Sequence, residues 1–270
     1  MYKDASMDLL LTMAIILSAV NENRWYHPTV STTWQWQLNT TPNRSYPNTN
    51  YDVDLYDLDL FDTEQSTIDA LHAEDKRVVC YFSAGSFEEW RDDADSFPEE
   101  ALGNNYDGWE GERWLDIRHS GLRTIILERL DLAQSKQCDG VEPDNMDAYT
   151  NDTGFALTAE DQLSYNMFLS ESAHERGLAI GLKNDLSQVE ALVKYFDFHV
   201  NEQCHLFEEC DLLTPFINAG KPVFNAEYDE RYYSEDDFIV LCQDAEQRQF
   251  QTLYLPTALD DTFRFSCENP

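Results

Sequence analysis

Four successive apolar segments of the chain end in acidic side chains that could serve as general acids, general bases or nucleophiles. Glu142 and Asp144 end one segment, and residues two apart in a strand point the same way. Glu202 and Glu227 end two later segments, whereas Asp185 directly precedes a helical pattern and is expected to cap that helix. Paired carboxylates are what glycoside hydrolysis needs: one protonates the leaving oxygen, and the other attacks the anomeric carbon or activates water.

A lysine and several aromatic residues accompany these acids. Lys183 lies inside an apolar segment, where an ammonium group is costly without an anionic partner, so we expect it to pair with one of the acids. Tryptophan and tyrosine rings either fill the core or offer flat faces on which sugar rings stack. The candidates for such stacking are Trp36, Tyr81, Trp90, Trp109, Trp114 and Tyr228.

The elements that position these residues alternate between strand and helix patterns. The expected strands cover residues 34–38, 53–58, 77–82, 140–144, 179–184, 198–203, 223–228 and 252–255. The expected helices cover residues 64–73, 121–134, 159–176, 186–195, 212–219 and 235–248. Because no glycine-rich phosphate loop is present, this alternation favours an α/β fold of the (β/α)8 TIM barrel type over a doubly wound sheet. In such a barrel the reactive side chains gather at the carboxyl ends of the strands.

Two stretches depart from a regular barrel. Residues 39–51 are rich in proline, asparagine and serine and have no helical period, so the first βα unit is expected to lack its helix. The link at 83–119, after the third strand, is long enough to predict a functional loop. Elsewhere the boundaries are conventional: Thr158 with Asp161 resembles a capping box, and Gly177 stands where a glycine ends a helix.

The charge of the chain restricts its partners. It has 52 acidic and 18 basic residues, for a net charge of −34, and the acids are spread along the whole sequence. Such a field repels nucleic acids and anionic membranes, and we predict neither as a partner. Two interpretations stay open: a solvated surface that keeps the protein soluble, or attraction of a cationic ligand.

The six cysteines show no paired metal-ligand spacing, so no metal site is predicted. Cys204 and Cys210 bracket a short loop and could form a disulfide if the protein is exported. Cys80 and Cys138 lie in apolar runs and are expected to be buried free thiols.

The N-terminal region holds an uncharged apolar run at residues 9–20, which is too short to span a bilayer. It is typical of the apolar core of a secretion signal, although a retained N-terminal helix is the alternative. We therefore divide the chain into an N-terminal segment, 1–29, and a single barrel domain, 30–270, and expect an extracellular protein.

Six ordered motifs carry a resemblance to a known family. They are CYFSAGSFEEWR (80–91), WLDIR (114–118), CDGVEPDNMDAY (138–149), LTAEDQLSYN (157–166), GLKND (181–185) and VNEQC (200–204). They resemble glycoside hydrolase family 114, the endo-α-1,4-polygalactosaminidase group, and the likeness runs from about residue 34 to residue 254. The resemblance implies a barrel enzyme that cuts α-1,4-linked galactosamine polymers internally, without a metal or organic cofactor.

Matching the motifs residue by residue implies the site. The catalytic pair falls on Asp144 in EPDN and Glu202 in NEQC, with Asp144 as nucleophile and Glu202 as acid/base by analogy with other barrels. The resemblance and the strand ends together suggest substrate contacts from Tyr81, Trp114, Asp116, Glu142, Asn145, Lys183, Asn184, Glu227 and Tyr228. The expected partner is a cationic or partly acetylated galactosamine polysaccharide, bound by a monomer.

Two other functions remain possible at this point. Glu142, Asp144, Glu202 and Glu227 could hold Mg²⁺ in a metal-dependent barrel enzyme, because successive strand ends can supply such oxygen ligands. A non-catalytic sugar-binding barrel would keep the aromatic residues and use the acids structurally. Sequence spacing does not give the distance between Asp144 and Glu202, on which the stereochemical course depends.

Overall fold

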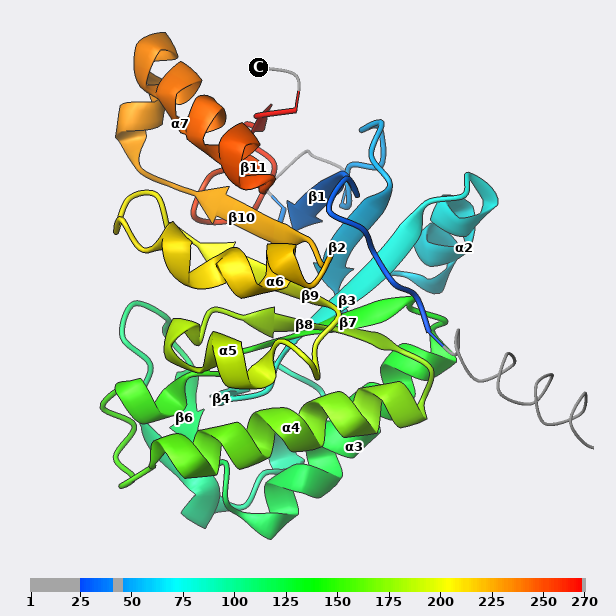
Figure 1. Ribbon diagram of the computed structural model, residues 1–270. Coiled ribbons are helices and arrows are strands. Elements are labelled where there is room, and N and C mark those ends of the chain that lie inside the picture. The colour runs from blue at the N-terminus through cyan, green and yellow to red at the C-terminus, as the bar shows by residue number, and fades with distance from the viewer. Residues whose placement is uncertain (1–24, 41–45, 269–270) are drawn as a thin grey trace, which may run out of the picture.

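The computed structural model describes residues 25–40 and 46–268 (Figure 1). The apolar run at 9–20, and with it the expected secretion signal, lies outside the described residues. Within the described ranges, no helix is both long enough and apolar enough to cross a membrane.

The described chain forms a curled sheet of parallel strands whose spatial order follows the sequence (Figure 1). The strands are β1 (Trp34–Gln37), β2 (Leu55–Asp59), β3 (Arg77–Ser83), β7 (Gly140–Asp144), β8 (Ala179–Lys183), β9 (Phe198–Glu202), β10 (Val223–Glu227) and β11 (Gln251–Tyr254). A short strand, β12 (Phe265–Ser266), pairs antiparallel with β11. All eight strands expected from the sequence are present, and the (β/α)8 barrel prediction is confirmed.

Side chains close the barrel between its first and last parallel strands. Among the described residues no strand ladder joins β1 to β11. Instead the indole of Trp34 donates a hydrogen bond to the Gln251 carbonyl at 2.9 Å, and the Arg264 guanidinium donates to the Trp34 carbonyl at 2.9 Å. Trp34 also stacks on Trp36 and packs with Phe224 in the buried barrel interior. Side-chain hydrogen bonds and aromatic packing therefore join the seam, together with main-chain bonds from Leu38 and Asn39 to the Leu259 carbonyl just beyond β11.

Helices cover the outside of the sheet (Figure 1). They are α2 (Gln65–Ala73), α3 (Ser120–Ser135), α4 (Ala159–Glu175), α5 (Val189–Leu192), α6 (Thr214–Asn218) and α7 (Glu235–Arg248). The predicted capping box at the start of α4 is confirmed, with reciprocal hydrogen bonds between Thr158 and Asp161. Gly177 follows this helix with a φ of 74°, a conformation that glycine adopts without steric cost.

Two of the expected helices are shorter than predicted. Each begins with a 3-10 turn, Leu186–Gln188 before α5 and Cys210–Leu213 before α6. Further 3-10 turns cover Ala148–Thr150 and Glu230–Tyr233. The expected cap at Asp185 is wrong: its backbone is left-handed and its side chain makes no cap hydrogen bond. That carboxylate accepts hydrogen bonds from Asn166 and Tyr149 instead.

The long link after β3 folds into a small antiparallel sheet. It contains β4 (Ser86–Glu88), β5 (Leu102–Asn105) and β6 (Glu112–Leu115), with 3-10 turns at Ala94–Ser96 and Glu99–Ala101. Buried Arg91 ties this insertion to the end of β2 through a two-pronged ion pair with Asp59, at 2.6 and 3.1 Å. Arg129 of α3 donates a further bond to the Ser83 carbonyl at 2.7 Å. Bidentate arginine pairs fix geometry well, so the insertion is held firmly against the strand ends.

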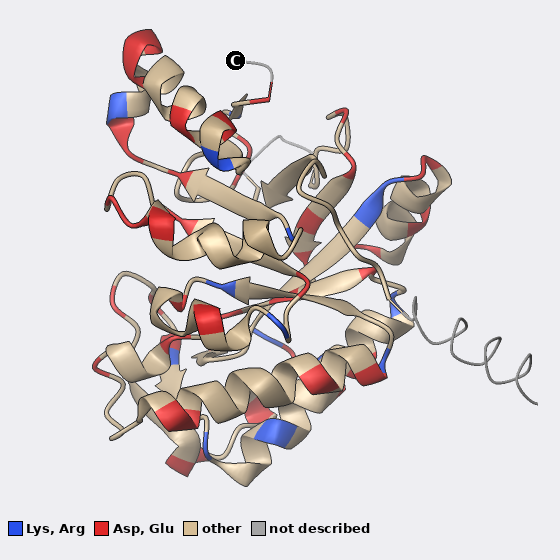
Figure 2. Ribbon diagram, in the orientation of Figure 1, with Lys and Arg blue, Asp and Glu red and all other residues tan. Residues whose placement is uncertain are grey.

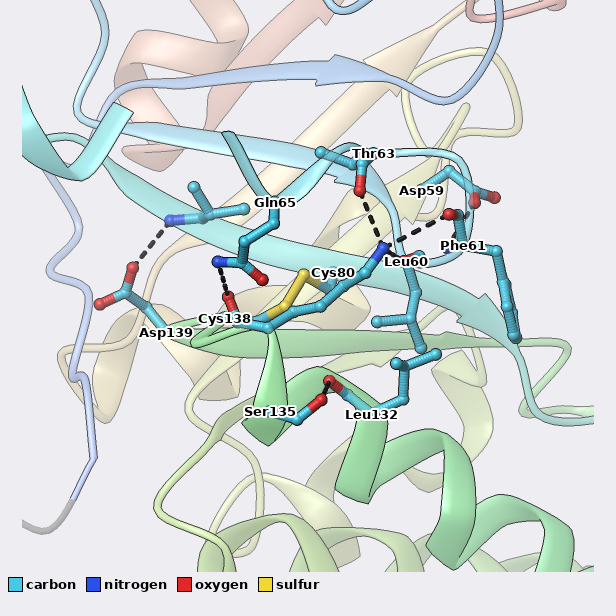
Figure 3. The surroundings of a disulfide bond; sticks show 12 residues. Asp59, Leu60, Phe61, Thr63, Gln65, Cys80, Leu132, Ser135, Cys138 and Asp139 are labelled. Carbon is cyan, nitrogen blue, oxygen red and sulfur yellow. Dashed lines mark hydrogen bonds between the residues drawn. A yellow bond between two sulfur atoms is a disulfide. The ribbon is translucent and has the colours of Figure 1, made fainter. Parts of the chain in front are cut away.

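Three disulfides link the described residues, and one of them corrects the sequence prediction. Cys80 of β3 is bonded to Cys138, which precedes β7, so neither is the free thiol expected (Figure 3). The prediction failed because β3 pairs directly with β7, which brings the two Cα atoms within 6.0 Å. The expected Cys204–Cys210 bridge is confirmed, and a third bridge joins Cys242 of α7 to Cys267.

The packing around the Cys80–Cys138 bridge is polar on one side (Figure 3). The Lys136 ammonium donates to the carbonyls of Leu60, Phe61 and Thr63, which ties the end of α3 to the turn after β2. Acidic residues are distributed over helices and loops throughout the described chain (Figure 2).

Candidate active site

A cavity of about 320 Å³ lies at the carboxyl ends of the barrel strands. Residues from β3, β7, β8, β9 and the turn after β10 line it, as the barrel fold predicts for a reaction site. The structure brings together here seven of the residues expected from the sequence: Tyr81, Asp144, Asn145, Lys183, Asn184, Glu202 and Tyr228.

Lys183 occupies the centre of the charged groups. Its ammonium nitrogen lies 3.1 Å from Asp144, 3.2 Å from Glu142 and 3.5 Å from Glu202, and 4.7 Å from the centroid of the Trp36 ring. Burial by itself would lower the pKa of this lysine, but the three carboxylates outweigh burial and raise the pKa well above its usual value. The expected pairing of Lys183 with the acids is therefore found, and the lysine is a permanent cation.

Asp144 accepts hydrogen bonds on both carboxylate oxygens. The Tyr81 hydroxyl donates to Oδ2 at 3.0 Å, and the backbone amide of Asn145 donates to Oδ1 at 2.7 Å. Together with the Lys183 ammonium, these donors stabilise negative charge on a carboxylate that is only 20% exposed. Such a fixed, charged and partly open carboxylate suits a nucleophile.

Glu202 is held from two sides at the end of β9. The Tyr228 hydroxyl donates to Oε1 at 2.7 Å, and the Asn184 side-chain amide donates to Oε2 at 3.0 Å. Asn184 also accepts from the Glu202 backbone amide, so it fixes both the main chain and the side chain. With 30% of its side chain exposed, Glu202 is more open than Asp144 and can exchange a proton with a ligand in the cavity.

The three strands that carry these groups end in the same way. Asn145, Asn184 and Gln203 directly follow Asp144, Lys183 and Glu202, and each has a left-handed backbone with φ between 50° and 63°. This conformation costs energy outside glycine and asparagine, and it clusters at functional sites. The Asp144–Asn145 turn is also closely packed, since a side chain at Gly85 would collide with the Asn145 carbonyl.

Glu142 and Asp57 form a carboxyl pair beneath the cavity. Both are buried, and Glu142 is completely so. The sequence predicted that Glu142 contacts the substrate, but Glu142 does not line the cavity. Burial raises the pKa of Glu142 to about 7, with Lys183 opposing the shift. Burial and the neighbouring Glu142 charge raise the pKa of Asp57 well above its usual value, which favours the protonated form of Asp57.

Three other expected contacts also lie outside the cavity. Trp114 is buried and packs against Tyr106, with ring centroids 4.6 Å apart, so it supports a lining residue. Asp116 forms an ion pair with Arg118 at 2.8 Å in the link that leads into α3. Glu227 is fully buried and accepts a hydrogen bond from the His205 backbone amide at 2.9 Å, and burial raises its pKa to about 7.

The insertion after β3 supplies lining residues that the motifs did not single out. Tyr106 and Glu112 lie in the cavity wall beside Trp109, which the sequence suggested only as one of several stacking candidates. Asp147, inside the CDGVEPDNMDAY motif, completes this wall. Burial raises the pKa of Glu112 to about 7 and that of Asp147 to about 6, and in Asp147 the charge of Asp144 adds to the shift. The length of the 83–119 link was the one signal that pointed to Tyr106 and Glu112.

The arrangement argues against a divalent metal at the strand ends. The Lys183 ammonium occupies the point where Glu142, Asp144 and Glu202 converge, and Glu227 faces the loop after β9. Elsewhere in the described chain, Cys204, His205 and Cys210 lie close enough together to suggest metal ligation, but the two sulfurs are bonded to each other.

Comparisons with known proteins agree with this geometry. The model of glycoside-hydrolase family GH114 matches residues 15–270. The solved structure of Aspergillus fumigatus Ega3 in complex with galactosamine is 39% identical, with a TM-score of 0.83, and the match covers 90% of this chain and 97% of that one. The glycoside hydrolase domain of PelA from Pseudomonas aeruginosa shares the fold at 14% identity, with a TM-score of 0.66 and coverage of 85% and 96%. A comparison with curated proteins found no match. An acid pair at the mouth of a barrel and a match over nearly the whole chain lead to one conclusion: this chain belongs to glycoside-hydrolase family GH114.

Proposed function

We propose that this enzyme is an endo-acting glycoside hydrolase that cleaves α-1,4-linked galactosamine polymers with Asp144 and Glu202. The observation that carries the proposal is the placement of the two carboxylates next to the same Lys183 ammonium, in a cavity at the strand ends. The galactosamine bound to Ega3, a relative of this chain at 39% identity, supports the choice of sugar.

The hydrogen bonds around each acid support distinct roles. Asp144, surrounded by three donors, attacks the anomeric carbon, while Glu202 gives its proton to the glycosidic oxygen and the carbon–oxygen bond breaks. In the second half of the reaction, Glu202 takes a proton from water, and that water displaces Asp144 from the sugar. Tyr81 and Lys183 hold the nucleophile, whereas Tyr228 and Asn184 orient the acid.

The distance limits support a retaining course. The Asp144 Oδ1 and Glu202 Oε2 atoms lie 3.1 and 3.5 Å from the Lys183 nitrogen. These two oxygen atoms therefore cannot lie farther apart than the sum of the two distances. Retaining enzymes separate their carboxyl groups by about 5–5.5 Å and inverting enzymes by about 6.5–9.5 Å. Proton NMR of the first products should therefore show the α-anomer, and initial release of the β-anomer would refute retention.

The charge of the cavity supports a cationic substrate. Asp144, Asp147, Glu112 and Glu202 line the cavity, and Lys183 is the one basic residue among its lining residues. The amine of a de-N-acetylated galactosamine unit is positively charged near neutral pH, so this wall attracts it. Full N-acetylation removes that charge and should weaken binding, more so at low ionic strength.

Product analysis tests the proposal directly. The enzyme should release reducing ends as oligosaccharides from partly deacetylated α-1,4-galactosamine polymer, and it should leave polygalacturonate and chitosan intact. EDTA should not change the rate, because Lys183 holds the place that a metal would take. Polymer binding without release of reducing ends would instead support a sugar-binding barrel, and loss of activity in EDTA would support a metal enzyme.

We also propose that the protein acts outside the cell. Three disulfides in the described chain support this view, because such bonds form and persist in oxidising compartments.

A further inference from the structure

A second hollow, which we call the Phe207 groove, opens from the catalytic cavity beside Glu202. It has a volume of about 380 Å³ and lies between the loops that follow β7, β8 and β9. The two hollows share Asp147, Asn184, Glu202 and Gln203, so the groove continues the cavity. Asp144 lines the cavity but not the groove, which places the groove on the Glu202 side of the reaction centre.

The groove presents an aromatic face to solvent on a locked loop. Phe207 is 60% exposed and lines the groove, so its ring is open to a ligand that enters there. The Cys204–Cys210 disulfide closes the loop, and the Phe207 backbone amide donates to the Gln203 carbonyl at 3.0 Å. The buried Glu227 carboxylate accepts a hydrogen bond from the His205 backbone amide, at the start of the same loop. The ring therefore rests on a pre-organised support.

The groove carries negative charge without a basic counterpart. Its lining includes four carboxyl groups, from Asp147, Asp185, Glu202 and Glu209, and none of its lining residues is Lys or Arg. Asp185 accepts hydrogen bonds from Asn166 and from the Tyr149 hydroxyl at 3.3 Å, and burial raises its pKa to about 8, so the negative charge comes from the other three acids. Glu209 among them is only half-buried. A flat apolar ring combined with carboxylates matches a sugar that has one apolar face and an ammonium group.

We propose that the Phe207 groove binds the galactosamine unit on the leaving-group side of the scissile bond, with the sugar ring on Phe207 and its ammonium group near Asp147 and Glu209. This inference rests on the proposed function and extends it. The side follows from Glu202: the group that protonates the leaving oxygen must contact the sugar that departs. A polymer bound across both hollows would then be cut internally, because it is held on either side of the reacting bond.

Isothermal titration calorimetry with an α-1,4-galactosamine hexasaccharide tests the groove. The parent is Asp144→Asn, which removes turnover and lies outside the groove. Adding Phe207→Ala should weaken binding about tenfold, the loss expected for one aromatic contact. Glu209→Gln should weaken binding of the free-amine hexasaccharide but not of its fully N-acetylated form. Trp90→Ala is the matched control, because Trp90 is 51% exposed but lines neither hollow.

Kinetics on the active enzyme separate the two proposals. Phe207→Ala in the otherwise unchanged enzyme should raise KM for the hexasaccharide about tenfold and leave kcat nearly unaltered, since Phe207 does not touch the reacting atoms. If the enzyme cleaves the polymer and both groove variants bind the hexasaccharide within twofold of the parent, the groove proposal is wrong and the proposed function stands. If the enzyme neither cleaves nor binds the polymer, both proposals are wrong.

Discussion

The ammonium nitrogen of Lys183, which lines the catalytic cavity, lies 3.2 Å from the Oε1 atom of Glu142, which is buried beneath it. Both side chains are almost completely buried, so neither can exchange its partner for water. Burial and the Glu142 charge raise the pKa of the neighbouring Asp57, which favours its protonated form and limits the net charge of this buried cluster. The lysine is thus fixed from below by Glu142 and can hold Asp144 in place above.

Replacing Lys183 with methionine should therefore damage both folding and catalysis. Loss of one partner leaves buried carboxylates uncompensated, which costs about 3–5 kcal/mol of unfolding free energy. Turnover should fall about 10²-fold or more, because Asp144 loses a positioning donor. Urea denaturation and initial rates measure the two effects. Lys76→Met is the control: Lys76 pairs with fully exposed Asp52, and that change should cost less than about 1 kcal/mol. Equal effects of the two variants would contradict the role of Lys183.

Asp144→Asn and Glu202→Gln should each lower turnover by about 10²-fold or more with the fold intact. Both substitutions keep the side-chain shape and remove the ionisable group that the reaction uses. The double variant should be little slower than the slower single variant, because both changes disable one chemical step. Initial rates measure the turnover of each variant, and circular dichroism checks that each variant is folded. If a folded single variant kept more than about a tenth of wild-type turnover, that residue's assignment would fall.

Glu227→Gln should remove part of the pH dependence of stability. Burial raises the pKa of Glu227 from 4.5 to about 7, so the folded protein holds this proton more tightly than the unfolded chain does. Its contribution to stability is present below about pH 4.5 and is lost as the pH rises through about 7. Glutamine keeps the acceptor for the His205 amide but cannot ionise.

At pH 8 the Glu227→Gln variant should therefore be more stable than the wild type, by on the order of 2 kcal/mol, and at pH 5 the two should differ by less than about 1 kcal/mol. Urea denaturation at both pH values measures the difference. Glu128→Gln, on the exposed face of α3, is the matched control and should leave the pH dependence unchanged. Parallel pH profiles for wild type and Glu227→Gln would refute the argument.

The disulfides should contribute unequally to stability. The Cys80–Cys138 bridge closes a loop of 58 residues and the Cys204–Cys210 bridge a loop of only 6. Chain-entropy reasoning gives losses of about 4 and about 2 kcal/mol on replacing each pair with serine. Denaturation of the two double variants checks the order, and the reverse order would show that strain or local packing outweighs loop entropy.

Intact mass spectrometry of the unreduced protein should find no free thiol on these four residues.

The sequence was most informative where the fold repeats. Alternating strand and helix patterns predicted all the parallel strands, and the positions of Asp144 and Glu202 at strand carboxyl ends predicted that they lie at one end of the barrel. Contacts across the insertion could not be predicted, because β4, β5 and β6 are too short to show a period, and the bonds from Arg91 and Arg129 near them join residues distant in sequence. The motif containing Trp114 therefore predicted a substrate contact where the structure has a ring behind Tyr106.

Adjacency between strands was the other missing information. Apolar surroundings fit a free thiol and a disulfide equally well, and only the pairing of β3 with β7 brings Cys80 to Cys138. Asp185 failed as a cap for a related reason, since the left-handed turn after β8 directs its carboxylate to Asn166 in α4. Both errors concern neighbours that are distant in sequence.

The side-chain seam between β1 and β11 gives the barrel a weak line under tension. When the chain is stretched, the evenly spaced hydrogen bonds of a strand ladder share the load, whereas the seam is joined by isolated bonds such as those from Trp34 to Gln251 and from Arg264 to Trp34. The Cys242–Cys267 bridge anchors the final strand to α7, so a pull on the C-terminus is transmitted to the helix and not to β12. Under a stretching force, we therefore expect the barrel to open between β1 and β11 before any of its parallel strand ladders separates.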